Sequence, residues 1–458
     1  MNRLRNIVAT TLLILSPLCA VANPAGAPSE PLCDQTALEA PDWIRNRTIY
    51  EVNVRQYSED GTFAAVEADL DRIQDLGIGV IWLMPIQPIG AVNRKGPLGS
   101  YYSVADYMGI NSEFGDAESF RSLVDAAHDR DIKVIIDWVG NHTAWDNPLT
   151  DEHPEFFIKD AEGNFTPPHG TDWTDVIQLD FSNRELWDYM SKAMEYWIIE
   201  YDIDGFRCDY AVGLPTKFWN FASRNLRTLD PELFLLAESE APDLNLHAFH
   251  ASYGWPMHHT FNSVAKGDKS ASAILDQFNR QSIEFPSSTL LLNFTTNHDE
   301  NSWNGTTAER LGPAKRTFDT LVFTLPGIPL IYNGQEASLA KRLEFFERDP
   351  IDWSDLSEMN FYQELTALKA SHPALSNPNA TFARIPTDRD EQIFAFTRTL
   401  GNRQVTVISN LSADPIEIHA ADRAIVGEHV DHFTGETTTL SYPAALQLQA
   451  WEFRVLTR

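Results

Sequence analysis

Residues Asp204-Gly205-Phe206-Arg207-Cys208-Asp209 place an arginine and a carboxylate two positions apart, directly after an apolar helical segment. If this stretch is a short β-strand, the alternation of side chains along it directs Arg207 and Asp209 to the same side. A guanidinium next to a carboxylate favours the ionised form and lowers the carboxyl pKa. An ionised aspartate is what a nucleophile requires. An ordinary Arg–Asp ion pair at a strand end fits these six residues equally well.

Three other apolar stretches also end in carboxylates or imidazoles. They are residues 132–142, 233–238 and 290–299. Apolar runs of this kind are typical of buried parallel strands. In a parallel barrel the carboxyl ends of all strands meet on one face, where catalytic groups gather. Three carboxylates on that face match the chemistry of glycoside cleavage.

These stretches resemble, in order, the motifs of the α-amylase superfamily of retaining α-glycoside hydrolases, which includes α-amylases, neopullulanases and oligoglucosidases. The matching residues are Asp137 to His142, Gly205 to Asp209, Glu238, and Asn297 to Asp299, and residues 327–336 resemble the eighth-strand signature. The resemblance covers roughly residues 40 to 375. Five motifs in the same order are far more specific than any one of them.

The resemblance implies a role for each matching side chain. Asp209 would attack the anomeric carbon, and Glu238 would protonate the leaving oxygen and then deprotonate the incoming water. Asp299 would hold sugar hydroxyls and stabilise the oxocarbenium-like transition state. His142 and His298 each follow an Asn at a strand end and resemble sugar-binding imidazoles, although single histidines are more often structural.

Residues 99–107 resemble the superfamily loop whose first tyrosine stacks on the sugar at the cleavage point. Alignment on Asp106 and Tyr107 assigns this role to Tyr102, with Tyr101 as the alternative one position away. An aromatic face suits the apolar face of a pyranose while the hydroxyl stays hydrated. Packing of a loop tyrosine on a neighbour is the other interpretation. Arg207 completes the residues that the motifs assign to the substrate site.

The alternation of strands and helices predicts an α/β fold, a (β/α)8 TIM barrel over residues 41–375. A Pro- and Gly-rich insertion at residues 143–182 follows the third strand and corresponds to domain B of the superfamily. The count of eight strands depends on a weak sixth strand near Thr260-Phe261-Asn262. Alternating runs over residues 376–458 predict a C-terminal antiparallel β-sandwich.

The first 22 residues have the features of a secretory signal peptide. Arg3 and Arg5 precede an apolar core at residues 7–18, and Ala20-Val21-Ala22 forms a small-residue cleavage site. The core is too short to span a membrane. Residues 23–40 are rich in Pro and Ala and predict a loose leader. We therefore expect a secreted or periplasmic protein.

The chain of 458 residues carries 65 Asp and Glu against 35 Lys and Arg, a formal net charge of -30. Such a charge is repelled by nucleic acids and anionic membrane surfaces, so neither is an expected partner. It is compatible with a neutral sugar substrate and with a saline habitat. Oligomeric state stays open.

No cofactor is expected, with calcium as the alternative. Asn141 matches a calcium-binding Asn of many α-amylases, and Asp172, Asp175 and Asp180 could add hard oxygen ligands. However, residues 210–214 lack the Lys-His pair that follows the nucleophile in many calcium-dependent members. No residue is therefore assigned as a metal ligand.

The resemblance implies hydrolysis of α-glucosidic linkages, α-1,4 foremost, in starch-derived maltooligosaccharides or related α-glucans. A transglycosylase or a sucrose- or trehalose-directed enzyme would share the same motifs. A third class, non-catalytic amylase-like partners of transporters, lacks the full set of acids that this chain carries. Linkage preference and endo or exo action stay open.

Overall fold

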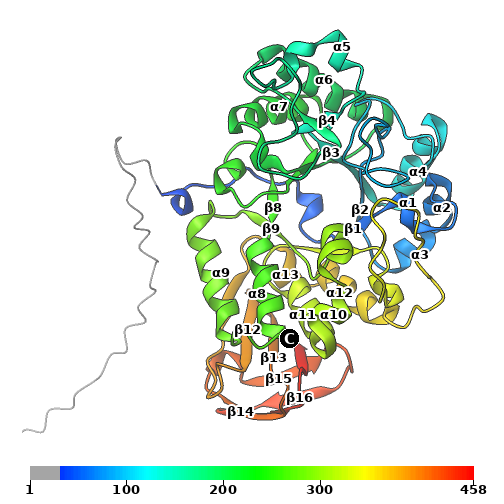
Figure 1. Cartoon of the computed structure of the whole chain (residues 1–458). Helices are drawn as coiled ribbons and strands as arrows, with labels where there is room; N and C mark the ends of the chain where they lie inside the picture. The colour runs from blue at the N-terminus through cyan, green and yellow to red at the C-terminus, as the bar shows by residue number, and fades with distance from the viewer. Residues whose placement is uncertain (1–30) are drawn as a thin grey trace, which may run out of the picture.

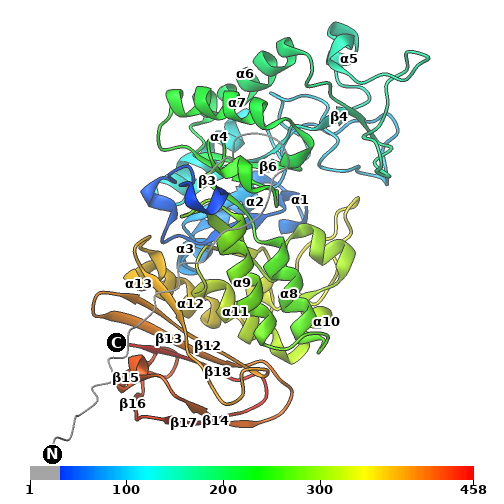
Figure 2. The ribbon, with the colours of Figure 1, turned by 90° about the vertical axis from the view of Figure 1, so that its left-hand side faces the viewer.

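The computed structural model describes residues 31–458. The predicted signal peptide and residues 23–30 of the predicted leader lie outside the described residues. A closed barrel of parallel strands occupies the centre of the molecule, surrounded by helices (Figure 1). The insertion and the C-terminal sheets lie at opposite ends of the molecule in both views (Figures 1 and 2). Together these features confirm the predicted barrel with a C-terminal β domain.

Eight strands close the barrel in the order β1-β10-β9-β8-β7-β6-β3-β2. Their bounds are β1 (Ile49–Val52), β2 (Val80–Leu83), β3 (Lys133–Val139), β6 (Gly205–Asp209), β7 (Phe234–Ala237), β8 (Ala251–Tyr253), β9 (Leu290–Asn293) and β10 (Ile328–Tyr332). The surrounding helices are α1 (Val54–Tyr57), α2 (Phe63–Ala68), α3 (Leu70–Asp75), α4 (Ala117–His128), α6 (Arg184–Tyr201), α7 (Thr216–Leu229), α8 (Trp255–Ala265), α9 (Ser272–Glu284), α10 (Thr307–Leu311), α11 (Lys315–Thr324), α12 (Met359–Ser371) and α13 (Pro373–Ser376).

The strands alternate between two buried environments because successive side chains point to opposite faces. On β6, Phe206 and Cys208 pack in the apolar layer between barrel and helices, while Arg207 occupies the interior with no exposed surface. Cys208 is a free, buried thiol on the helix side. This alternation confirms that Arg207 and Asp209 share one side of the strand, where they form an ion pair.

The predicted sixth strand near residues 260–262 is wrong, because those residues lie within α8. The observed strand is β8, only three residues long, which is too short to show a period of two. Pro256 lies in the first turn of α8, where its missing N–H costs nothing. Met257, Phe261 and Val264 recur at helical spacing and are buried. Burial of that helical face outweighs the strand propensity of Thr260 and Phe261.

The insertion after β3 is built on a short antiparallel pair, β4 (His142–Ala144) and β5 (Val176–Gln178). It also contains a single helical turn, α5 (Leu149–Glu152). Because β4 begins three residues after β3 ends, the insertion rises directly from the carboxyl face of the barrel.

The C-terminal region forms two antiparallel sheets. Six strands pair in the order β11-β12-β13-β18-β15-β16, and β14 pairs with β17. Their bounds are β11 (Thr381–Arg384), β12 (Ile393–Leu400), β13 (Arg403–Asn410), β14 (Ile416–Ala420), β15 (Gly427–Asp431), β16 (Thr437–Leu440), β17 (Ala444–Leu448) and β18 (Phe453–Thr457). Phe396 and Val407 on the larger sheet join the core of the barrel helices, so this region supports the barrel. No helix in residues 31–458 is both long and apolar enough to cross a membrane.

Candidate active site

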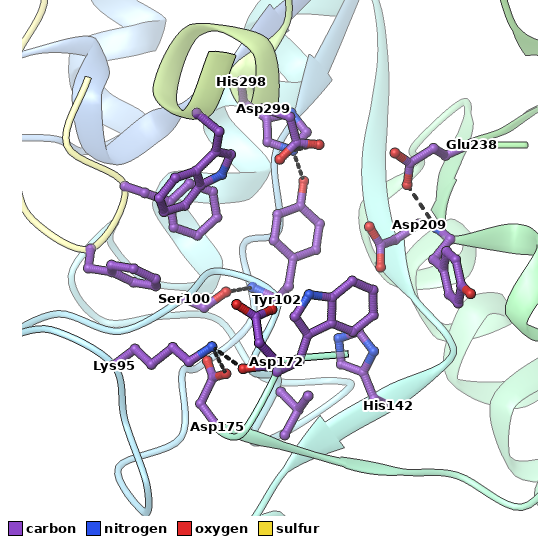
Figure 3. Close-up of a pocket in the computed structure, with 16 residues that line it drawn as sticks. Lys95, Ser100, Tyr102, His142, Asp172, Asp175, Asp209, Glu238, His298 and Asp299 are labelled. Atoms are coloured by element: carbon purple, nitrogen blue, oxygen red, sulfur yellow. Dashed lines mark hydrogen bonds and ion pairs between the residues drawn. The ribbon is translucent and has the colours of Figure 1, made fainter. Parts of the chain in front are cut away.

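A cavity of about 560 Å³ opens at the carboxyl ends of the barrel strands (Figure 3). Six of the seven predicted site residues line it: Tyr102, His142, Asp209, Glu238, His298 and Asp299. They come from segments spread over nearly 200 positions of the chain. The barrel brings them together because parallel strands direct their carboxyl ends to one face.

The three predicted catalytic carboxylates follow three barrel strands. Asp209 is the last residue of β6, Glu238 directly follows β7, and Asp299 comes six residues after β9. The backbone N–H of Glu238 donates to the carbonyl of Cys208 at 3.0 Å, which continues the β6–β7 pairing to the edge of the pocket. Asp209 and Glu238 therefore lie on neighbouring strand ends.

Arg207 lies beneath the pocket, buried, and does not line it. Its Nη1 donates to Asp209 Oδ1 at 3.0 Å, and to Asp137 Oδ1 and Oδ2 at 2.9 and 3.1 Å. Its Nη2 forms an ion pair with Glu238 Oε2 at 2.9 Å. The backbone N–H of Tyr210 donates to the same Glu238 oxygen, at 2.9 Å. One guanidinium thus orients both predicted catalytic carboxylates.

Burial governs the charge balance of the carboxylates. It raises the pKa of Asp209 above its usual value, and Arg207 only partly offsets that rise. It likewise raises the pKa of Asp299, opposed by His298, and it raises the pKa of Asp137 to about 7, opposed by Arg207. The sequence predicts a lowered pKa for Asp209, and the net direction here is the opposite. Removal of water from several neighbouring acids outweighs the single guanidinium.

His298 is held between two acids. Its Nδ1 lies 2.5 Å from Glu51 Oε1, and its Nε2 lies 2.8 Å from Tyr102 Oη and 3.4 Å from Asp299 Oδ2. Burial acts to lower the pKa of His298, but Asp299 and Glu51 outweigh it and raise the pKa to about 9. His298 is therefore an imidazolium at neutral pH, with Glu51 as its buried counter-ion.

Glu51 is absent from the predicted site, although the sequence carries a signal for it. It stands in the apolar strand β1 and has no exposed surface. A buried glutamate is rare unless it is paired. A charged residue in the middle of an apolar barrel strand therefore indicates a buried partner, here His298.

Tyr102 presents its ring to the pocket and stacks on His298, with centroids 5.5 Å apart. Its hydroxyl donates to Asp137 Oδ2 at 3.2 Å. Tyr101, the alternative from sequence, is fully buried, does not line the pocket, and packs beneath the Arg55 guanidinium. The structure thus places Tyr102, and not Tyr101, in the wall of the pocket.

His142 lines the pocket on the side of the insertion. Its ring packs at 5.3 Å from that of Trp173, and its Nδ1 lies 3.2 Å from the Asn141 side-chain amide. Burial lowers the pKa of His142 to about 4. At neutral pH His142 is therefore uncharged while His298 is an imidazolium. Both ring nitrogens of His298 can donate, whereas His142 has one donor and one acceptor.

The residues considered for calcium do not fit a cation. Gln178 Nε2 donates to Asn141 O at 3.0 Å, Asn141 Oδ1 at 3.1 Å and Leu179 O at 3.2 Å. A hydrogen-bond donor therefore occupies the centre that these oxygens surround. Asp175 forms an ion pair with Lys95 at 3.4 Å. Within residues 31–458 no three His, Cys, Asp or Glu side chains gather as a metal site.

Several further residues line the pocket that the sequence pattern does not identify. Lys95, Phe345 and Phe346 lie on loops, Tyr210 directly follows β6, and Trp303 lies in the short helical segment Glu300–Asn304. Trp303 keeps 52% of its surface exposed and packs on Phe345 at 5.2 Å. The doublet Phe345-Phe346 in a polar loop is the one local signal that could indicate a binding surface.

This chain is similar to known proteins over most of its length. The catalytic-domain model of the alpha-amylase family matches residues 45–164 and 169–371. An alpha-amylase from Lactobacillus plantarum is 33% identical with a TM-score of 0.81, and the match covers 91% of this chain and 100% of that one. The maltogenic alpha-amylase AmyB from Thermotoga neapolitana is 29% identical with a TM-score of 0.84, covering 90% and 99%. The alpha-amylase MalA from Haloarcula japonica is 29% identical over 83% of this chain, which spans only 57% of that relative's length.

Proposed function

Because this chain belongs to the α-amylase family, we propose that it hydrolyses α-glucosidic linkages, α-1,4 foremost, with retention of configuration. The proposed substrates are maltooligosaccharides and related α-glucans. The names of the relatives, alpha-amylases and a maltogenic alpha-amylase, support this substrate class. A pocket that combines aromatic rings with carboxylates suits the alternating apolar and hydroxyl surfaces of a pyranose.

One observation carries the proposal: a single guanidinium contacts Asp209 at 3.0 Å and Glu238 at 2.9 Å. Two carboxyl groups that share one guanidinium lie close together. Retaining enzymes keep their two carboxyl groups about 5–5.5 Å apart, whereas inverting enzymes need about 6.5–9.5 Å to admit a water. The shared Arg207 holds both carboxyl groups around one guanidinium, and the retaining mechanism that we propose requires the shorter separation.

In the first step Asp209 attacks the anomeric carbon, and Glu238 transfers its proton to the glycosidic oxygen as the C–O bond breaks. The product is a covalent glycosyl ester on Asp209, and the leaving chain departs as an alcohol. In the second step Glu238 takes a proton from water, which displaces Asp209 and restores both carboxyl groups. The anomeric carbon is inverted twice, so the α configuration is kept.

The remaining residues orient the sugar. In this proposal Tyr102 offers a ring face beneath the pyranose, and the imidazolium of His298 and neutral His142 bind its hydroxyls. Asp299, 3.4 Å from His298, contributes negative charge next to the developing oxocarbenium ion. These positions convert binding energy into alignment of the anomeric carbon with Asp209.

The test is the configuration of the first product. Proton NMR during early hydrolysis of maltoheptaose should show the α-anomer of the new reducing end before mutarotation. An initial β-anomer would show that Asp209 acts as a base for water. Absence of any new reducing end would refute hydrolysis itself.

We also propose that the protein is exported, on the basis of Arg3, Arg5, the apolar residues 7–18 and the small residues that follow. N-terminal sequencing of the protein from the medium or periplasm of a bacterial host should begin at Asn23. Recovery only from the cytoplasm with Met1 intact would contradict export.

A further inference from the structure

The loop of residues 91–99 lies between β2 and α4 and borders the pocket. Lys95 from this loop is part of the pocket wall. Its Nζ donates to the carbonyl of Asp172 at 2.7 Å and lies 3.4 Å from Asp175 Oδ1, so it reaches across to the insertion. Figure 3 shows the Lys95 ammonium at the end of its side chain, in contact with Asp172 and Asp175. We call this contact the Lys95 bridge.

The same loop is fastened on its other side to the segment that carries Phe345 and Phe346. The backbone N–H of Leu98 donates to the Phe346 carbonyl at 3.0 Å. Gly96 lies so close to Phe346 that a Cβ there would come within 2.5 Å of the Phe346 Cβ. The loop therefore spans from the insertion to the aromatic segment as a continuous barrier.

A buried arginine holds this barrier from below. Arg55 has no exposed surface. Its Nη1 donates to the Gly99 carbonyl at 2.9 Å and its Nη2 to the Leu98 carbonyl at 3.2 Å. At the start of the loop, the backbone N–H of Ala91 donates to Asp146 Oδ2 at 2.8 Å. A loop bound at its start, middle and end is not free to swing away from the pocket.

The chemistry of the site determines which end of a sugar chain meets this barrier. A sugar whose anomeric carbon faces Asp209 and whose glycosidic oxygen faces Glu238 directs its C4 away from Glu238, because C1 and C4 are at opposite ends of the ring. In Figure 3 Tyr102 lies between Glu238 and Lys95. The C4 side, which leads to the non-reducing end of the chain, therefore points toward the Lys95 bridge.

We propose that the barrier makes this protein act from the non-reducing end of an α-glucan, and that Lys95 is a specificity-determining residue. The inference rests on the proposed hydrolysis and adds the direction of attack to it. The Lys95 ammonium has three protons and two partners in the protein, so it can donate to a free hydroxyl of the terminal sugar. An internal glucan segment continues through O4 and would have to break the Lys95 bridge to enter.

The experiment compares p-nitrophenyl α-maltoheptaoside with the same compound carrying an ethylidene bridge across O4 and O6 of its terminal non-reducing glucose. Initial rates of substrate loss are measured by chromatography. The wild-type protein should consume the blocked compound at least about tenfold more slowly, since one pocket contact discriminates by roughly 10–200-fold. Lys95→Ala, which removes the whole bridge, should raise the ratio of blocked to unblocked rates severalfold, and Asp175→Asn, which removes only the ion pair, should raise it less.

Lys192→Ala, which removes an exposed ammonium from α6, is the control and should leave the ratio unchanged. Thermal melting of each variant separates a change in specificity from a loss of fold. Equal wild-type rates on both compounds would refute action from the non-reducing end. An unchanged ratio in both bridge variants would refute the role of Lys95. No turnover of the unblocked compound would instead refute the proposed function.

Discussion

Arg207 is the residue on which the charge balance of the site depends. Its guanidinium, without solvent contact, reaches Asp137, Asp209 and Glu238. Removing one partner of such a buried group leaves an uncompensated charge, which is strongly destabilising. The local pattern of β6 is enough to predict the contact with Asp209 but not the contact with Glu238, which comes from the next strand.

The two catalytic carboxylates should respond differently to amide substitution. Asp209→Asn removes the attacking charge, so kcat should fall by about 10⁴-fold or more on every α-glucoside. Glu238→Gln should lower kcat by about 10²–10⁴-fold on maltooligosaccharides, but much less on α-maltosyl fluoride, whose leaving group needs no proton. Steady-state kinetics on both substrates checks this.

Glu240→Gln is the matched control for these variants, since Glu240 is exposed two positions beyond Glu238. It should keep wild-type kinetics. If Glu238→Gln lost the same factor on the fluoride as on maltooligosaccharides, Glu238 would not be the general acid.

Glu51→Gln should shift the alkaline limit of activity to lower pH. Burial acts to lower the pKa of His298, and Glu51 is one of the two acids that overcome it and raise the value to about 9. Without the Glu51 charge, His298 should lose its proton at a lower pH, by about one unit or more. Profiles of kcat/KM between pH 6 and 10 measure this limit.

The direction in which the alkaline limit shifts distinguishes a positioning role of Glu51 from a purely structural one. A variant that only loosened the fold would lower kcat/KM at every pH and leave the alkaline limit in place. That outcome would show that the Glu51 carboxylate does not control the protonation of His298.

At the scale of elements, the β4–β5 pair shows how the insertion is attached to the barrel. Residue Asn141 lies between β3 and β4, and Gln178 is the last residue of β5. Three oxygens converge on the Gln178 amide at 3.0 to 3.2 Å. A neutral amide thus ties the insertion to the carboxyl face of the barrel.

Activity and stability should therefore be insensitive to chelation. EDTA should leave kcat and the melting temperature of the wild-type protein unchanged, because the oxygens are already satisfied by Gln178. Gln178→Ala should lower the free energy of unfolding by about 1–3 kcal/mol, since it removes the side-chain donor to Asn141 Oδ1 and to the Leu179 carbonyl. Calorimetry with and without EDTA and calcium measures both.

Gln447→Ala, at an exposed position on β17, provides the control and should change the stability little. A large fall in melting temperature on chelation, reversed by calcium, would contradict this interpretation. It would indicate that the oxygens around Gln178 bind a cation in solution.

At the scale of the whole molecule, the net charge of -30 acts on stability through self-repulsion. Salt screens charges separated by more than about 8–10 Å at moderate ionic strength. The melting temperature at pH 7 should therefore rise by several degrees between 0.05 and 1 M NaCl. Near pH 4.7, where the net charge approaches zero, the same salt increase should have a smaller effect. A melting temperature that fell with salt at pH 7 would show that local ion pairs outweigh the repulsion.

The sequence by itself determined the parallel barrel, the insertion after the third strand and the antiparallel C-terminal region. It also determined that Asp209, Glu238 and Asp299 share one face. These features depend on local periodicity and on the rule that parallel strands end on the same side. Local periodicity fails for a strand as short as β8, whose three residues show no period, and the sequence pattern predicts the sixth strand instead at residues that form α8.

Only the tertiary structure decided what each site residue touches. Glu51 and His298 are 247 positions apart and lie 2.5 Å from each other. Lys95 meets Asp175, 80 positions further along the chain, in the wall of the pocket. The raised pKa of Asp209 likewise depends on burial among neighbouring acids, which outweighs the adjacent Arg207. Contacts and desolvation of this kind depend on distances through space, and no pattern along the chain encodes those distances.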